Sequence, residues 1–206
     1  MDKNATTITG VEQGRAKFAY ECANQVVTLS DFTYGTFTIA TSGLIKTYLE
    51  NKFKDPKTKQ FKDQSTGRMV SAFLQAPQQQ YKAYKDKQPS REGKIEEAYA
   101  KYGKEYKSLV KKIPMLIKTN GLGAAFAFVL SKADNGNPNQ LIYHQTAEWL
   151  KHDSKGLIHL TDNSQLAHEL VQKKSAEYRA ITVEVLAFFT WLKRFAEGLI
   201  EGEADD

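Results

Sequence analysis

The chain has 206 residues, of which 41% are hydrophobic and 26% charged, and its formal net charge is +5 at pH 7. This composition is typical of one folded domain and excludes a largely disordered chain. No stretch approaches the roughly 18 uninterrupted apolar residues that cross a bilayer, and the first ten residues lack the pattern of a secretory signal, so we expect a cytoplasmic protein.

Positive charge is concentrated in the middle of the chain. Residues 44–112 contain 17 Lys and Arg against 8 Asp and Glu, so the remainder is slightly acidic. A basic stretch of this kind suits a polyanionic partner, because clustered cations release the counterions that condense on phosphates. A solvated lysine-rich surface explains the same composition equally well.

The chain begins with a predicted amphipathic helix. Apolar residues recur at helical spacing between Val11 and Ser30, and Arg15 and Lys17 lie near the start of this segment. The only cysteine, Cys22, is expected to be a small core residue. Residues 31–42 are rich in Thr, Gly and aromatic residues, which favours a short extended segment or a turn.

The next part of the chain is less regular. We expect a short helix at 44–53 and a polar, turn-rich loop at 55–67. Residues 69–84 are compatible with a helix, although the stretches Pro77–Gln80 and 87–93 are predicted to be mobile.

Residues 94–118 are the most informative stretch, because their side chains divide into two helical faces. Apolar residues including Tyr106, Ile113 and Ile117 share one face. The opposite face carries a predicted lysine ridge, whose members project within about 80° of Lys104. They are Lys101, Lys107, Lys111, Lys112 and Lys118. Pro114 predicts a kink or a restart of this helix.

Four further helical segments follow. Residues 119–132 begin with a glycine break and continue as an apolar run, which predicts a helix buried between others. Residues 134–139 form a turn by composition. Helices are then expected at 141–152, 163–174 and 175–200, the last one with a long apolar stripe.

Cations also share one sector of the last predicted helix. Arg179, Lys193 and Arg194 project into a solvent-facing sector, about 130° from the centre of the apolar stripe. Weak surface ion pairs with Glu197, one turn away from Lys193 and Arg194, are the alternative to a binding role.

No pattern in the sequence points to catalysis. Metalloprotease, phosphate-loop and nucleophile-elbow motifs are all missing from it. The histidines lack the spacing of paired helical ligands: they are His144, His152, His159 and His168. Gly121-Leu122-Gly123 offers backbone amides to a phosphate, but close helix packing explains it equally well. We therefore expect no enzymatic activity, cofactor or metal.

Three stretches together carry a resemblance to a known family. They are EQGRAKFAYEC at Glu12–Cys22, YKSLVKKIPMLIKTNGLG at Tyr106–Gly123 and EYRAITVEVLAFFTWLKRFA at Glu177–Ala196, and they occur in that family's order. The chain resembles the small subunit of type III-B CRISPR (Cmr) effector complexes. The resemblance implies a single all-α domain over 1–206, a compact bundle of about six to eight helices.

The resemblance also implies a function and partners. A small subunit of this kind has no catalytic role in antiviral defence and lines the groove in which guide RNA and target RNA pair. Its partners would be both RNAs, other Cmr subunits and further copies of itself. The alternative is a helical protein interaction module whose lysines only keep it soluble.

The family's pattern points to candidate phosphate contacts in this chain, because a groove that leaves sequence choice to RNA pairing needs positive charge without base selection. These candidates are Arg15, Lys17, Lys107, Lys111, Lys118, Arg179, Lys193 and Arg194.

Residues 31–103 depart from the family's pattern. This basic stretch is much longer than the expected connection between the first two family helices, so we interpret it as an insertion or extension within the domain. It would extend the RNA-binding surface, cover a neighbouring subunit or form a mobile loop.

Overall fold

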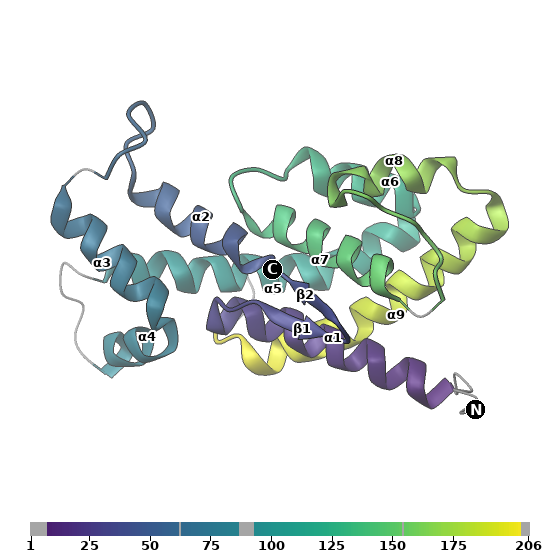
Figure 1. Ribbon diagram of the computed structural model, residues 1–206, viewed down its shortest axis with the longest axis horizontal. Coiled ribbons are helices and arrows are strands. Elements are labelled where there is room, and N and C mark those ends of the chain that lie inside the picture. The colour runs from purple at the N-terminus through teal and green to yellow at the C-terminus, as the bar shows by residue number, and fades with distance from the viewer. Residues whose placement is uncertain (1–7, 62, 87–92, 154, 203–206) are drawn as a thin grey trace.

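The computed structural model describes residues 8–61, 63–86, 93–153 and 155–202. Within these ranges the protein has nine α-helices, one short 3-10 helix and a two-stranded hairpin (Figure 1). The predicted all-α class is confirmed. The number of helices exceeds the expected six to eight, partly because the predicted helix at 69–84 is divided in two. Ala76 leaves the helical region at this division, as a residue before proline tends to do.

The N-terminal elements are helix α1 (Ile8–Thr28), strands β1 (Phe32–Tyr34) and β2 (Phe37–Ile39), and helix α2 (Ser42–Phe53). The strands pair antiparallel, with Phe32 opposite Ile39, so the predicted extended segment is confirmed. Gly35 turns the chain between them with a φ of 60°, a value that glycine adopts without strain.

Helices α3 (Gln64–Gln75) and α4 (Pro77–Asp86) follow a loop. The stretch Pro77–Gln80, which was expected to be mobile, forms the first turn of α4, with Pro77 as its first residue. Proline suits this position, since the first turn of a helix has no intrahelical partner for its N–H groups. The stretch predicted to be mobile at 87–93 lies, apart from Gly93, outside the described residues.

Helix α5 (Lys94–Asn120) continues through Pro114, so the predicted restart does not occur. Gly121 ends it with a φ of 82° and leads into α6 (Leu122–Ser131). Helix α6 was expected to be buried between other helices. Only one face is buried: Phe126 is fully enclosed, whereas Phe128 on the other face is 49% exposed.

The C-terminal part consists of α7 (Pro138–His152), the 3-10 helix (Asn163–Gln165), α8 (Leu166–Gln172) and α9 (Ser175–Leu199). The predicted apolar stripe of α9 is confirmed at its centre. Ile181, Val185, Phe188, Phe189 and Leu192 are all fully buried.

One hydrophobic core joins these elements. Phe18 of α1 lies near its centre, with ring centroids 5.4 Å from Trp149 of α7 and 6.0 Å from Phe188 of α9. Cys22, one helical turn further along α1, is fully buried, as predicted. Residues from α2 and α3, including Phe73, belong to the same cluster. In the described part of the chain, no helix combines the length and apolarity that a membrane span needs.

Candidate nucleic-acid interface

The antiparallel pair of α5 and α9 positions most of the predicted cationic site residues. Lys111 of α5 lies 3.5 Å from Glu197 near the end of α9. At the other end of the pair, the Tyr178 hydroxyl near the start of α9 accepts a hydrogen bond of 2.8 Å from the Gly123 amide, just beyond α5. The cations of the two helices therefore lie along one long helix pair.

A first group of cations lies near the C-terminal half of α9. Lys193 and Arg194 are exposed, and the Arg194 guanidinium lies 5.3 Å from the centre of the Trp191 ring. Glu197 was the expected alternative partner of these two cations, but it pairs with Lys111 instead. Both members of that pair are more than one third exposed, so it contributes little to stability and exchanges readily for another anion.

A second group lies where α5 ends and α9 begins. Lys118 is exposed in the last turn of α5, and Arg179 is exposed directly after Tyr178. The Gly121 and Gly123 amides between the helices were candidate phosphate ligands. Close helix packing was the equally good alternative, and the structure favours it, because Gly121 donates to the Ile117 carbonyl at 2.9 Å and Gly123 donates to the Tyr178 hydroxyl. At this end of the helix pair, the groups available to bind an anion are therefore the side chains of Lys118 and Arg179.

Lys17 is the exposed cation of α1. It is three residues before Tyr20, on the same side of the helix. The Tyr20 ring contacts Phe195 of α9 edge to face, with centroids 5.5 Å apart. Lys17 therefore lies on the side of α1 that borders α9.

Arg15 is not an exposed cation, which corrects the prediction that it faces a phosphate. Its side chain is 5% exposed and forms a two-pronged contact with Glu184 of α9, with Nε to Oε1 at 2.8 Å and Nη2 to Oε2 at 3.0 Å. It also pairs with Glu12. The hydrogen bond from Arg15 to Glu184 raises the pKa of Arg15 despite burial. Arg15 thus joins α1 to α9.

Glu184 explains why Arg15 is buried. Its position within the apolar stripe of α9 leaves its side chain fully enclosed. Burial alone raises the pKa of Glu184, but hydrogen bonds from Arg15 and Lys155 outweigh this and lower it below its ordinary value. A glutamate on an apolar helix face needs a cation from another element. The placement of Glu184 between Ile181 and Val185 is visible in the sequence and would have predicted a buried cationic partner.

Lys107 is also not part of an exposed ridge, which is a second correction. It is only 5% exposed, and its Nζ donates to the Ile200 carbonyl at 2.7 Å and to the Gly202 carbonyl. A lysine in this position satisfies carbonyls at a helix C-terminus, where the helix dipole favours positive charge. Its charge stabilises the end of α9 and is not available to RNA.

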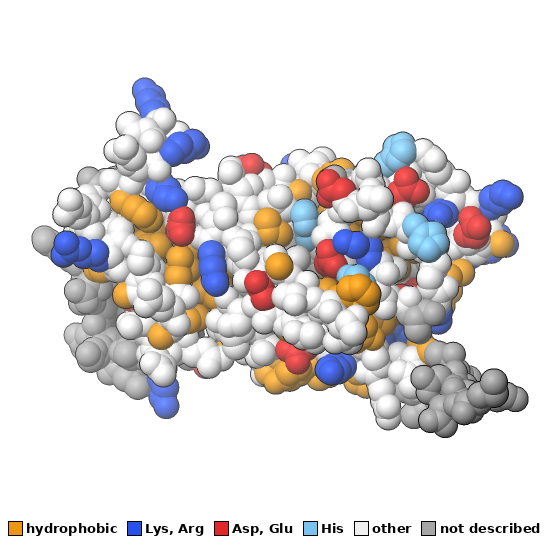
Figure 2. All heavy atoms as spheres, viewed as in Figure 1, with side chains coloured by type: hydrophobic (Ala, Val, Ile, Leu, Met, Phe, Trp, Pro, Cys, Tyr) orange, Lys and Arg blue, Asp and Glu red, His pale blue; other side chains and the backbone are white. Residues whose placement is uncertain are grey.

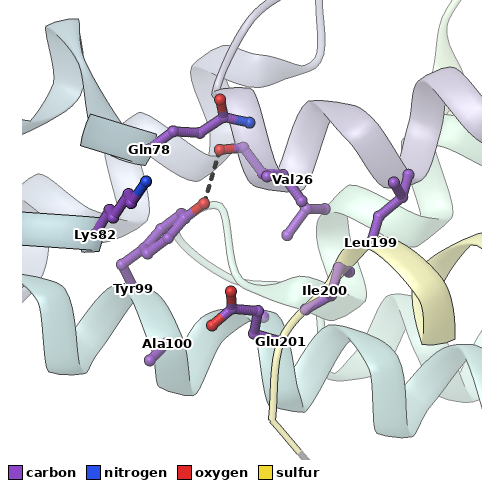
Figure 3. Close-up of a pocket in the computed structure, with 10 residues that line it drawn as sticks. Val26, Gln78, Lys82, Tyr99, Ala100, Leu199, Ile200 and Glu201 are labelled. Carbon is purple, nitrogen blue, oxygen red and sulfur yellow. Dashed lines mark hydrogen bonds between the residues drawn. The ribbon is translucent and has the colours of Figure 1, made fainter. Parts of the chain in front are cut away.

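The molecule also has a pocket of about 450 Å³ between α1, α4, α5 and the end of α9 (Figure 3). Val26, Leu199 and Ile200 give it apolar walls, and Lys82 and Glu201 add charged groups. The Tyr99 hydroxyl beside it donates to the Val27 carbonyl at 2.7 Å.

The fold and these surfaces define a small all-α protein with exposed cations along a long helix pair. Within the described residues, no three His, Cys, Asp or Glu side chains are arranged to hold a metal ion. The family model for the CRISPR-associated protein Cas_Cmr5 matches residues 91–199. The CRISPR system Cmr subunit Cmr5 of Thermus thermophilus is 32% identical over 109 residues, which are 52% of this chain and 87% of that protein. This chain belongs to the Cmr5 family.

The matched range confirms the predicted family and includes α6 to α9 together with all of α5. Two of the three stretches that carried the resemblance, Tyr106–Gly123 and Glu177–Ala196, lie inside it. The stretch Glu12–Cys22 lies outside it, as does the whole segment 31–90 with the hairpin and helices α2 to α4.

Proposed function

We propose that this chain is a small, non-catalytic subunit of a type III-B CRISPR effector complex, acting in the cytoplasm in antiviral defence. In this role it binds the RNA backbone along the groove in which guide RNA and target RNA pair. Membership of the Cmr5 family supports the assignment, and the relative from Thermus thermophilus is itself named as a Cmr subunit.

The observation that carries RNA binding is the set of exposed cations on α1, α5 and α9. They are Lys17, Lys111, Lys118, Arg179, Lys193 and Arg194. Such side chains bind phosphates without selecting bases, which suits a complex whose sequence choice comes from RNA pairing. Arg15 and Lys107 are left out of the proposed interface, because both are buried and hydrogen-bonded.

The proposal also includes contacts with other Cmr subunits and with further copies of this chain. Large apolar side chains are exposed on four helices: Met115 is 66% exposed, Phe128 49%, Val171 69% and Val183 66%. Exposed apolar surface of this kind favours protein contacts. The same observation supports the second candidate function, a helical interaction module without RNA binding.

Measurement of RNA binding by the double variant Lys111→Ala/Lys118→Ala distinguishes an RNA-binding subunit from an interaction module that does not bind RNA. If each lysine neutralises one phosphate, the slope of log affinity against log salt falls in magnitude by about 1.4 for single-stranded RNA. Fluorescence anisotropy with a labelled oligouridine at several salt concentrations measures the slope. A similar loss is expected with unrelated RNA sequences, because the contacts do not read bases.

The matched control is Lys94→Ala/Lys132→Ala, which removes the same charge from exposed positions at the start of α5 and just after α6. Its slope should stay close to that of the unaltered protein. Equal losses in both variants would mean that only net charge matters. Wild-type protein that pairs with Cmr subunits but does not bind RNA would establish the interaction module instead.

A further inference from the structure

A short loop between α2 and α3 projects from the molecule (Figure 1). It spans residues 54–61 and is closed at its base by antiparallel pairing of Lys54 with Phe61. The Lys54 Nζ lies 5.2 Å from the centre of the Phe61 ring, and Phe61 packs against the core cluster. This loop lies outside the range that the family model matches.

Asp55 holds the backbone of the loop in one shape. Its Oδ1 accepts hydrogen bonds of 2.9 Å from the amides of both Lys57 and Thr58. Two backbone bonds between Asp55 and the far side of the loop, to Lys59 and Gln60, close the turn at 2.9 and 2.8 Å. A loop ordered in this way loses less conformational entropy when it binds a partner.

The charge of the loop region is strongly positive. Residues 52–68 contain six Lys and Arg against two Asp. Both carboxylates accept hydrogen bonds from backbone amides. Asp55 does so within the loop. Asp63 is the N-cap of α3, and its Oδ1 accepts from the Thr66 amide at 2.7 Å. Hydrogen bonds from Ser65 and then Thr66 lower the pKa of Asp63 to about 2.

The lysines at the tip of the loop are exposed, and their side chains do not stabilise its backbone. Lys57 and Lys59 contribute their backbone amides to the turn, while their side chains face solvent. Neither forms an ion pair with any residue that the structure describes. In the space-filling view, Lys and Arg side chains occupy the tip of the projection, whereas they are interspersed with Asp and Glu over α7 and α8 (Figure 2).

We propose that the loop 54–61 is a second RNA-backbone binding element, with Lys57 and Lys59 as its phosphate contacts. This site is additional to the proposed surface on α1, α5 and α9. The inference rests on the proposed function only because RNA is taken to be the polyanion that the loop binds. The loop lies toward the end of the long axis opposite the start of α9 and projects to one side of that axis (Figure 1). RNA that extends beyond α5 and α9 toward this end of the molecule would meet it.

The test uses the full chain and the variant Lys57→Ala/Lys59→Ala. Loss of two phosphate contacts should reduce the log salt slope for an oligouridine by about 1.4 and weaken binding by about 25-fold at about 0.1 M salt. The fold should be unaffected, because alanine retains both backbone amides. The variant Lys57→Arg/Lys59→Arg keeps the charge and should bind like the unaltered protein.

Two outcomes would overturn the inference. One is a slope for Lys57→Ala/Lys59→Ala that matches the charge control Lys94→Ala/Lys132→Ala. The other is an equal loss in the arginine and alanine variants, which would exclude charge as the cause. A loss in the loop variant with no loss in Lys111→Ala/Lys118→Ala would support the loop and contradict the α5 part of the proposed interface, so the two proposals fail separately.

Discussion

Lys107 and Lys111 are one helical turn apart on α5, yet their side chains do different things. Lys107 is buried against the end of α9 and donates to its terminal carbonyls, whereas Lys111 is 38% exposed and pairs with Glu197. The same residue type on the same helix therefore has a structural role at one position and an available charge at the next. Arg15 and Lys17 on α1 divide in the same way, with Arg15 bound to Glu184 and Lys17 exposed.

We predict that Lys107→Met lowers the free energy of unfolding by about 1 to 3 kcal/mol, because it leaves the Ile200 carbonyl buried without its charged donor. Methionine keeps an apolar stem of similar length, so the loss reports the ammonium group. Lys111→Met should change the stability by less than about 0.5 kcal/mol. Urea denaturation followed by circular dichroism measures both.

RNA binding should respond to these two variants in the reverse order, with the larger effect from Lys111→Met. Lys107→Met is expected to keep the salt slope of the unaltered protein, while Lys111→Met lowers it by about 0.7. If Lys107→Met left stability intact and reduced the salt slope, the buried position of this side chain would be contradicted and the original lysine ridge restored.

At the scale of elements, each segment is positioned by a few polar contacts as well as by apolar packing. Tyr106 of α5 donates to Gln145 of α7 at 2.7 Å inside the core, and Asp63 caps the start of α3. Asp55 supplies such contacts to the loop 54–61, which has no apolar core of its own. The shape of this loop therefore depends on the Asp55 carboxylate together with the backbone hydrogen bonds that close the turn.

Two variants that remove the same charge test the role of this carboxylate. Asp55→Asn retains an oxygen that accepts from the Lys57 and Thr58 amides, as asparagine does in this kind of turn, whereas Asp55→Ala does not. Both raise the net charge by one. We predict that Asp55→Asn binds RNA at least as tightly as the unaltered protein and that Asp55→Ala binds more weakly than Asp55→Asn.

Anisotropy titrations at one salt concentration measure the RNA affinity of these two variants. Hydrogen exchange of the Lys57 and Thr58 amides measures how well the loop backbone stays ordered in each. Faster exchange is expected in Asp55→Ala alone. Equal RNA affinity of the two variants, in spite of faster exchange in one, would show that the loop contributes charge without any benefit from its fixed shape.

At the scale of the whole molecule, the segment outside the family match shares its core with the matched part. Phe73 of α3 is 2% exposed, and its ring contacts Tyr99 of α5 edge to face at 5.2 Å. Ile45 and Leu49 of α2 are fully buried in the same cluster. The segment 31–90, which lies outside the family match, is thus packed onto the family's helices.

A shared core predicts one cooperative unfolding transition. Phe73→Ala should lower the stability of the entire chain by about 3 to 5 kcal/mol, because it leaves a cavity in that core. Helix content and tryptophan fluorescence should shift together, since both tryptophans, Trp149 and Trp191, lie in α7 and α9, far from α3 in sequence. The control Ser71→Ala changes an exposed residue of the same helix and should have little effect.

Separate transitions would contradict this prediction. If Phe73→Ala shifted only part of the helical signal and left the fluorescence midpoint unchanged, then α2 to α4 would unfold as an independent unit. The segment 31–90 would in that case be an appended domain instead of an extension of the core.

The amino-acid sequence by itself determined the class of fold, the main helices and the family. The 3.6-residue spacing of apolar side chains predicted the buried stripe of α9, and glycine at 121 predicted the break between α5 and α6. These features are local, because they depend on the angle of each residue around its own helix axis and on the backbone freedom of glycine.

Only the tertiary structure decided which cations are available. Arg15 forms an ion pair with Glu184, which is 169 positions away in the sequence, and Lys107 donates a hydrogen bond to the Ile200 carbonyl, which is 93 positions away. Helical spacing placed Lys107 on the polar face of α5, although it aligns Arg15 with the apolar residues Phe18 and Cys22 of α1. Helical spacing contains no information about which other elements lie opposite a given face, and the ion-pair and hydrogen-bond partners of both cations depend on those neighbours.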